Sequence, residues 1–587
     1  MFNKYYEDEL SFLREMGREF AAAHPAQADF LANPGDDPDV ERLLEGFAFL
    51  TGRLRQKLDD EIPELTQSLM QLLWPHYLRP VPAMSVIQFE PVPQLVREPQ
   101  SIPRGTEVDS VPVEGTSCRF RTAYDVQLLP LAIETVEVER PAGAAGDLKV
   151  AFRIASGVKV DKLPLQGLRL FLHGDPVVVN AAYLQLTRRV RRVIVRAPGA
   201  GSGAMAARPA EAVKPIGFAV SESLLPYPPH AFPGYRLLQE YFALPQKFIF
   251  LEIAGLPPLA GLGVKDAFEI LFEFDRAPEG PLRLTSENVR LHCTPVVNLF
   301  SMQSDPIRVD HQRVEYLLRP GSASPGHHEI FSIESVKGWA KGTSQQREYP
   351  SFHSFRHATA DTATGGTIYY HTRLRNSVTG QGMDTYLSFI TGDQKGAVPQ
   401  EETVVADLIC SNRHLPAGLR AGDINKPTGS SPEFAKFRNI STVTESVTPP
   451  LGGDLHWRMI SNMSLSYLSL TNADALRSLL DIYNLQALQR RQAARENELR
   501  LAGIVTLKSF PEERIWMGSP VRGRRIEIDM KEENFTGEGG MVLFASVLNE
   551  FFSLYCTLNS FTHLVVRGVK QGETYSWNPR IGQQPLV

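Results

Sequence analysis

The sequence contains few cysteines and no long apolar run. Its 587 residues include 4 cysteines, Cys118, Cys293, Cys410 and Cys556, which lie far apart and form no CxxC pair. This spacing excludes a disulfide framework and a cysteine-based zinc site, and it favours buried free thiols in a reducing compartment. No stretch reaches the roughly 18 consecutive apolar residues of a membrane span. The start, MFNKYYEDEL, carries acids where a secretory signal needs a basic start. We therefore expect a cytoplasmic chain that does not insert into a membrane.

A large charge of either sign is also missing. Lys and Arg number 61 and Asp and Glu number 66, for a formal net charge of −5. The charge balance therefore gives no indication of nucleic-acid or membrane binding. One basic run lacks interleaved aromatic residues, and we expect it to be a solvated or partner-facing strand. It consists of Arg188, Arg189, Arg191, Arg192 and Arg196.

Motifs for catalysis or metal binding are weak or missing. PGAGSG at 198–203 is not followed by the Lys-Ser or Lys-Thr of a phosphate-binding loop, and no G-x-S-x-G motif occurs. Scattered carboxylates leave a glycosidase pair open. We expect no catalytic, metal-binding or cofactor-binding residue. The metal candidates that we discount for lack of further ligands are His353, His357 and Asp361, and the run His327-His328-Glu329.

The first 80 residues have the apolar periodicity of helices. One helix is expected to end at His24-Pro25, and a second is expected to begin at Pro38. The seam of this second helix repeats in steps of three and four, as in a coiled coil: Val40, Leu43, Phe47, Leu50 and Leu54.

The segment DDEIP at 59–63 is expected to break this helix and to start a third one. The third helix carries Leu65, Leu69, Leu72 and Leu73 and ends before Trp74-Pro75. These helices can close into a bundle within one chain or contribute to a bundle with a partner, and the periodicity alone leaves both open.

The amino-acid composition of the remaining sequence changes twice. Short runs rich in Val, Ile and Phe, separated by Gly and Pro, predict sandwich-like β domains at 81–300 and 301–450. The Gly/Ala-rich stretch from 198 to 215 is expected to be a surface loop. In 451–587, a helix capped by Thr471 and Asp474, a strand at Ile526–Met530, an apolar helix and a strand at Leu564–Val566 predict an α/β domain. The fold class is multi-domain α+β, with an N-terminal helical segment at 1–80.

The apolar C-terminal helix has more apolar surface than one packing partner covers. Two hypotheses remain for it. Its own chain, through the helix from Asp474 to Tyr483, can wrap it, or a second copy of the chain can cover it. The residues at stake are Val547, Phe551, Phe552 and Tyr555.

Several long segments together resemble the TssF family, also called ImpG or VasA. They include YYEDELSFLREMGREFAAAHP, the helices from DPDVERLLEGF to LLWPHYLRPVP, FPGYRLLQEYFALPQKFIF, CTPVVNLFSMQSDPIRVDHQRVEY, ICSNRHLP, LHWRMISNMSLSYLSL and LFASVLNEFFSLYCTLNSFTHLVVR. The resemblance runs from Met1 to the C-terminal WNPRIGQQPLV. A Gly/Ala-rich loop near 199–211 looks like a length-variable insertion.

The resemblance implies a non-enzymatic subunit of the type VI secretion baseplate, similar to a wedge protein of contractile phage tails. It implies two copies of the chain with one TssG in each wedge, with TssK and TssE attached. Six wedges surround the spike, whose hub VgrG is a further candidate partner, and the assembly docks to the inner-membrane secretion complex. The alternatives are a β-rich carbohydrate-active enzyme and a wedge protein of a phage tail or tailocin. Partner contacts are expected at Phe47, Leu50, Leu54, Leu69, Leu72 and Trp74, and at Val547, Phe551, Phe552 and Tyr555.

Overall fold

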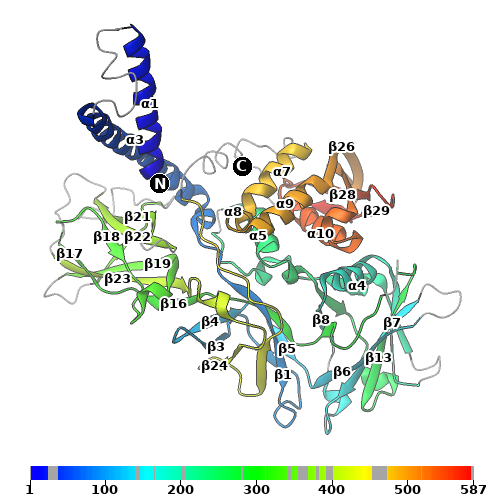
Figure 1. The fold of residues 1–587 in the computed structure, drawn as a ribbon. Helices are drawn as coiled ribbons and strands as arrows, with labels where there is room; N and C mark the ends of the chain where they lie inside the picture. Colours follow the sequence, from blue (N-terminus) through cyan, green and yellow to red (C-terminus); the bar gives the residue numbers. More distant parts are fainter. Residues whose placement is uncertain are drawn as a thin grey trace. The chain divides into compact units, whose positions relative to one another are not determined.

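The architecture comes from a computed structural model of the chain (Figure 1). The structure describes residues 2–23, 38–139, 146–163, 165–199, 205–228, 231–278, 282–310, 312–340, 346–353, 368–377, 382–391, 401–451, 472–516 and 518–582. The chain divides into two compact units. One comprises Met1–Leu78 with His353–His357 and Pro450–Arg458, and the other comprises the rest. We refer to them as the helical unit and the main unit.

The helical unit is built on helices α1 (Phe2–Ala23) and α3 (Pro38–Leu73). They run antiparallel, because Arg14 pairs with Glu41 while Gly52 lies against the backbone of Tyr5 and Tyr6. A Cβ added at Gly52 would stand 3.2 Å from that backbone, so the missing side chain permits the close approach. The expected end near His24 and the expected start at Pro38 are confirmed.

The break expected at 59–63 is wrong. Helix α3 continues through Pro63 as far as Leu73, and η2 (Pro75–Leu78) follows it. Proline removes one helical hydrogen bond, but its fixed φ is a helical value, so the backbone path can be maintained by neighbouring turns. Among the described residues up to Leu73, two α-helices therefore stand where three were expected.

In the main unit, one sheet holds the first β core. The core includes Phe89, Phe120, Val296 and Phe437, all buried. The small ladder of β2 (Gln100–Ile102) and β5 (Val126–Leu128) contributes to the same core. In spatial order the strands are β24 (Ile424–Pro427), β3 (Glu107–Val113), β4 (Thr116–Thr122), β15 (Cys293–Val297), β1 (Met84–Pro91) and β25 (Ala435–Asn439). We call this the β1 sheet.

Residues 300–411 form a sandwich inserted between β15 and the return of the chain to the β1 sheet. Its sheets enclose a core with Tyr316, Val336, Leu387 and Leu408. One sheet contains β16 (Phe300–Gln303), β23 (Glu402–Ser411), β19 (Glu329–Ala340), β20 (Gln346–Tyr349) and β17 (Ile307–Val309), and the other contains β18 (Tyr316–Leu318), β22 (Met383–Thr391) and β21 (Ile368–Asn376).

The strand pairing corrects the expected division of 81–450 into consecutive segments. Strands β24 and β25, which lie after residue 411, pair with β3 and β1 of the first sheet. The second β segment is therefore an insertion rather than a C-terminal neighbour. The sequence could not show that the second segment is an insertion, because both segments have the same composition of strand and turn residues.

Residues 131–290 add two further sheets and two helices. The helices α4 (Pro176–Arg188) and α5 (Pro233–Ala243) were not expected within a β-rich stretch. Part of the expected Gly/Ala-rich loop is strand β10, which pairs with β9, whereas 200–204 lie outside the described residues. The sheets are, in order, β10 (Met205–Pro209), β9 (Val190–Arg196), β13 (Ala267–Phe274), β7 (Asp147–Ile154) and β6 (Leu131–Glu139), and β11 (Val213–Pro215), β12 (Phe250–Ala254), β8 (Gly167–Leu172) and β14 (Val289–Arg290).

The C-terminal α/β domain has the expected strand–helix–strand unit. Strands β27 (Ser519–Met530) and β28 (Ser560–Gly568) pair in parallel, and α10 (Glu538–Leu554) connects them. The cap of α7 is Asn472, whose side chain accepts a hydrogen bond from the Asp474 amide at 3.0 Å, and Thr471 lies outside the described residues. The other elements are β26 (Ile504–Trp516), β29 (Thr574–Ser576), β30 (Arg580–Ile581), α7 (Ala473–Tyr483), α8 (Leu485–Gln489) and α9 (Arg491–Gly503).

A buried ion pair holds α5 in place. Glu240 and Lys247 form a salt bridge, and the side chains of both are 0% exposed. Glu240 also accepts hydrogen bonds from the amides of Leu224 and Leu225, at 2.8 and 3.1 Å. The Tyr124 hydroxyl donates to the Lys247 carbonyl at 3.0 Å, which ties the β1 sheet to the same turn. Burial lowers the pKa of Lys247, with Glu240 opposing the shift.

Replacing Lys247 with Met should therefore destabilise the protein by about 3–5 kcal/mol, because it leaves the Glu240 carboxylate buried without its cation. The double variant Lys247→Met with Glu240→Gln should recover part of this loss, since an amide oxygen can still accept from Leu224. Denaturant unfolding of the full chain measures both effects, with the exposed Lys436→Met as control. Equal losses in the single and double variants would contradict the assignment.

Candidate partner interface

The coiled-coil seam of α3 lies on the surface of the helical unit. Leu43, Phe47, Leu50 and Leu54 are 74%, 57%, 61% and 62% exposed. In contrast, Ala48 of the same helix is fully buried on the side that faces α1. The stripe that the periodicity predicted is thus exposed among the described residues of the helical unit.

A second apolar stripe runs along α1. Phe12, Met16 and Phe20, one helical turn apart, are 58%, 48% and 45% exposed. The face of α1 toward α3 carries Leu10 and Arg14, and the centre of the stripe lies about 140° around the helix axis from these two residues. On α3, the centre of the seam lies about 130° around the axis from the buried Ala48. Each helix of the pair therefore exposes an apolar stripe on a side that does not pack on the other helix.

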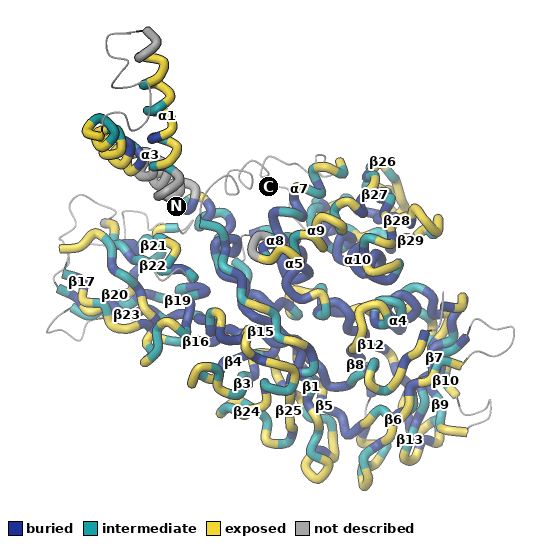
Figure 2. The backbone as a smooth tube through the Cα atoms, in the orientation of Figure 1, coloured by how far each residue is buried: buried dark blue, intermediate teal, exposed yellow. Residues whose placement is uncertain are grey.

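We call these two stripes together the apolar face. The sequence analysis predicted no partner contact at Phe12, Met16 or Phe20. Helical periodicity contained the signal, but the side that faces α3 was set by packing. Figure 2 shows long exposed stretches on α1 and α3. The residues of the apolar face are Phe12, Met16, Phe20, Leu43, Phe47, Leu50 and Leu54.

The other residues near the end of α3 that were expected to contact a partner differ in their exposure to solvent. Leu69 is 39% exposed, Leu72 is half-buried, and Trp74 is 8% exposed. Met70 is fully buried. Of these, Leu69 has the most accessible side chain, and Trp74 is a buried residue in the single chain.

The C-terminal helix is covered by its own chain. Val547 and Phe551 are fully buried, and Phe552 is 1% exposed. Phe551 meets the Phe232 ring edge-on at 6.0 Å, and Tyr555 packs on the same ring at 4.2 Å. Figure 2 shows α10 buried along its length. Val547, Phe551 and Phe552 are thus covered within the chain and Tyr555 is half-buried, while a contact between α10 and a second copy stays a prediction.

The cover differs from the one expected within the chain. Helices α4 and α5 pack on α10, whereas the expected cover was the helix from Asp474 to Tyr483. A Cβ added at Gly539 would stand 2.0 Å from the Asn180 carbonyl oxygen, so the missing side chain lets α4 approach. Helix α7 instead stacks Tyr483 on Tyr235 of α5, with ring centroids 4.7 Å apart. Helices α4 and α5, which were not predicted from the sequence, therefore cover the apolar surface of α10.

The basic run is largely neutralised within the chain. Arg196 pairs with Glu269 at 2.8 Å, and Arg192 pairs with Glu273. Arg189 is buried and contacts Glu538 and Glu573 at 3.1 and 2.9 Å. Arg188 lies over the Trp577 ring at 3.9 Å. Arg192 and Arg196 thus join β9 to β13, whereas Arg188 and Arg189, at the end of α4, join that helix to the C-terminal domain, so these four residues have partners within the chain.

The discounted metal candidates remain separate. Glu329 is buried and accepts from the Met383 amide at 3.0 Å, whereas His327 contacts Thr116 at 2.8 Å. His357 and Asp361 lie outside the described residues. Within the described ranges, no three His, Cys, Asp or Glu side chains gather as metal ligands. The four cysteines are free and buried, as expected, and burial raises the pKa of Cys118 to about 12.

A series of side-chain hydrogen bonds in the C-terminal sheet was not predicted from the sequence. Glu512 lies 2.8 Å from His563 Nδ1, and His563 Nε2 lies 2.9 Å from the Ser576 hydroxyl. The order acid, imidazole and hydroxyl is also found in hydrolases, which need oxyanion donors beside the nucleophile as well. Here Arg514 donates to Glu512 at 2.7 Å, and Arg188 donates to the Ser576 carbonyl at 3.0 Å. The observed bonds tie β26, β28 and β29 together.

Comparison with known proteins identifies the family. Residues 1–584 match the family described as "Type VI secretion system, TssF". The chain belongs to the TssF family. It is 32% identical over 632 residues to the type VI secretion system component TssF1 of Pseudomonas aeruginosa, with 99% of each chain covered.

Solved structures agree with this family. The chain is similar to a chain of the type VI secretion system TssK-TssF-TssG baseplate subcomplex determined by cryo-electron microscopy. The TM-score is 0.75 at 32% identity, covering 93% of this chain and 100% of that one. For the baseplate complex from the type VI secretion system, the TM-score is 0.65 at 27% identity with full coverage of both chains.

Among the helices that the structure describes, none combines the length and the apolar character that a membrane span needs.

The burial of Phe552 predicts a stability effect in this family member. Phe552→Ala should lower the free energy of unfolding of the full chain by about 3–5 kcal/mol, because it removes a buried ring and leaves a cavity. The nearby Leu558→Ala, at a residue 48% exposed, should change it by less than about 0.5 kcal/mol. Thermal or denaturant unfolding compares the two. Unchanged stability with altered self-association would instead favour a shared interface at α10.

Proposed function

We propose that the protein is a structural subunit of the type VI secretion baseplate wedge. Family membership over almost the whole chain supports this role, and the exposed apolar face of α1 and α3 carries the argument for assembly. Exposed apolar patches of this kind mark interaction surfaces, because water leaves them when a partner binds. The role requires no catalysis by the chain itself.

The partner that best fits the apolar face is a helical segment of TssG. The seam on α3 repeats as Leu43, Phe47, Leu50 and Leu54, which is the spacing that receives knobs from a facing helix. The stripe on α1 is a second exposed apolar surface, so the two helices together can accept more than one partner helix. A solved relative is described as part of a TssK-TssF-TssG subcomplex, which supports TssG and TssK as candidate partners.

The finer composition follows the family resemblance. We infer two copies of this chain with one TssG, with TssK and TssE attached and with the spike hub VgrG as a further neighbour. The assembly would reside in the cytoplasm and dock to the inner-membrane secretion complex. It would transmit rearrangement at its interfaces to the contractile sheath, as a rigid-body switch. The family match favours this role over a phage-tail wedge or a carbohydrate-active enzyme.

The substitution Leu50→Asp tests the apolar face. A carboxylate buried there would cost about 3 kcal/mol or more, roughly a hundredfold in affinity, because no cation compensates it. Co-expression with TssG and TssK, followed by affinity purification, should therefore recover much less partner. The main unit should keep its thermal transition. The matched control is Leu499→Asp on α9, which places the same charge at an apolar residue 52% exposed.

The same face predicts how the isolated chain behaves. Without partners, the wild-type chain should self-associate at micromolar concentration, and co-expressed TssG should suppress this. Leu50→Asp should reduce the self-association while it also reduces partner binding. Light scattering during size exclusion measures the change. A monodisperse wild-type monomer would contradict the proposed role of the face.

A further inference from the structure

The inserted sandwich of residues 300–411 joins the β1 sheet at a buried polar contact. The chain leaves the β1 sheet at Asn298, directly after β15, and returns at Asn412, directly after β23. The two side chains are 0% and 1% exposed. They belong to the sequence segments CTPVVNLF and ICSNRHLP, for which the assembly role gives no explanation.

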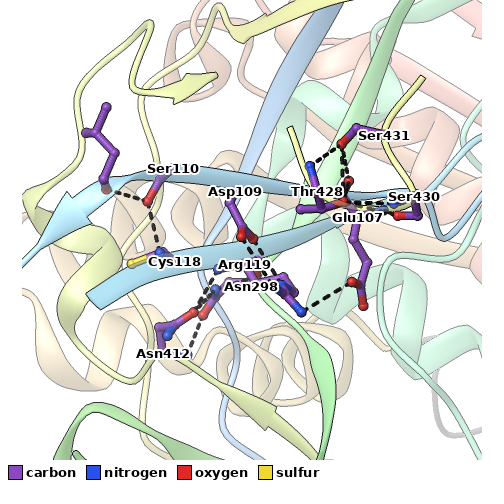
Figure 3. Close-up of polar contacts among 11 residues, drawn as sticks. Glu107, Asp109, Ser110, Cys118, Arg119, Asn298, Asn412, Thr428, Ser430 and Ser431 are labelled. Atoms are coloured by element: carbon purple, nitrogen blue, oxygen red, sulfur yellow. Dashed lines mark hydrogen bonds and ion pairs between the residues drawn. The ribbon is translucent and has the colours of Figure 1, made fainter. Parts of the chain in front are cut away.

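The two asparagines bind each other and one residue of β4. The Asn298 side-chain amide donates to the Asn412 side-chain oxygen at 2.8 Å, and the Asn412 backbone amide donates to the Asn298 side-chain oxygen at 2.6 Å. Asn298 also donates to the Arg119 carbonyl at 2.7 Å, and the Arg119 amide donates to Asn412 at 3.0 Å. Figure 3 shows this group between the strands. Both ends of the insertion are thus held at the same point.

Arg119 is itself braced. Its guanidinium donates to both carboxylate oxygens of Asp109, at 3.0 and 3.2 Å, and lies 3.4 Å from Glu107 on β3. The Glu107 carbonyl in turn accepts from the hydroxyls of Thr428 and Ser431, each at 2.8 Å. These contacts, also drawn in Figure 3, lead from the asparagine pair across β4 and β3 to the loop after β24.

We propose that Asn298 and Asn412 form a clasp that fixes the angle of the sandwich on the β1 sheet. Movement of the sandwich strand β23 relative to β4 and the end of β15 would pull Asn412 away from Arg119 and Asn298 and leave buried amide donors and acceptors without partners. Unsatisfied buried polar groups are costly, so the clasp has one favourable arrangement instead of a range of angles. The backbone of Arg413, with φ of 52°, places the returning chain in the left-handed region and restricts it further.

A fixed angle matters for an assembly subunit. Load on the sandwich would pass through the clasp to Arg119, and from its guanidinium to β3. With the clasp intact, a contact made by the sandwich would displace the β1 sheet, whereas a loose joint would absorb the movement. This consequence rests on the proposed role in the baseplate. The clasp itself does not, because it is a property of the single chain.

Distance measurements on the full chain test the clasp. Spin labels at Gln346→Cys on the sandwich and Lys436→Cys on β25 occupy exposed positions, whereas the native cysteines are buried. The label-to-label distance should have one narrow distribution, which Asn298→Ala should broaden. The matched control is Asn376→Ala, an exposed asparagine at the end of β21, which should leave it unchanged. An equally narrow distribution in Asn298→Ala would overturn the proposal.

Hydrogen exchange gives a second measurement that needs no spin label. In the wild-type chain, the amides of Arg119 and Asn412 should exchange slowly, and Asn298→Ala should accelerate both by about tenfold or more. Amides inside the two sheets should keep their protection. Rapid exchange at Arg119 and Asn412 in the wild type would overturn the clasp. So would collapse of both cores in Asn298→Ala, which would make the pair part of the fold rather than a joint.

Co-purification separates this inference from the proposed function. If the wild-type chain binds no baseplate subunit while the distances and exchange behave as expected, the clasp stands and the proposed function fails. If the wild type assembles but its joint is as loose as that of Asn298→Ala, the clasp fails and the proposed function stands.

Discussion

A salt bridge that water does not reach constrains the main unit. Glu240 and Lys247 are both fully buried, so their desolvation must be offset by partners in the right places. Those partners come from different segments: the amides of Leu224 and Leu225, and the Tyr124 hydroxyl that binds the Lys247 carbonyl. Helix α5 cannot take its position unless the loop before it and the edge of the β1 sheet take theirs. This helix then supplies the aromatic cover of α10.

The two units differ in how completely they cover their apolar surface. In the main unit, α10 is closed over by α4, α5 and β28, and the inserted sandwich has a core of its own. In the helical unit, α1 and α3 cover only part of each other, and Phe47 and Leu50 remain exposed. This difference is consistent with the proposal that the two helices contact a partner. The polar clasp at Asn298 and Asn412 fits the same division, since it orients bodies without exposing apolar surface.

The apolar stripe of α3, which forms part of the proposed partner surface, could be predicted from the sequence. The spacing from Leu43 to Leu54 indicated an apolar stripe in either an isolated or an intermolecular bundle, and the structure adds that it is exposed. The same reasoning failed for α10, because an excess of apolar positions shows that cover is needed but not where the cover lies. Part of the cover of α10 comes from Phe232 and Tyr235, roughly three hundred positions earlier in the chain. They lie at the start of α5, which was not predicted because the surrounding sequence is rich in strand-forming residues.

The sequence by itself determined the local structure and the family. Apolar periodicity located α1, the seam of α3, the parallel strands β27 and β28, and the helix between them, because these patterns depend on neighbouring residues. Long matching segments identified the TssF family. Tertiary structure alone decided that the β segment between Asn298 and Asn412 is an insertion, that these two asparagines meet, and that Phe12 and Met16 stay exposed, as the α3 seam does. Each of these depends on contacts between segments far apart in the chain, which local propensity does not encode.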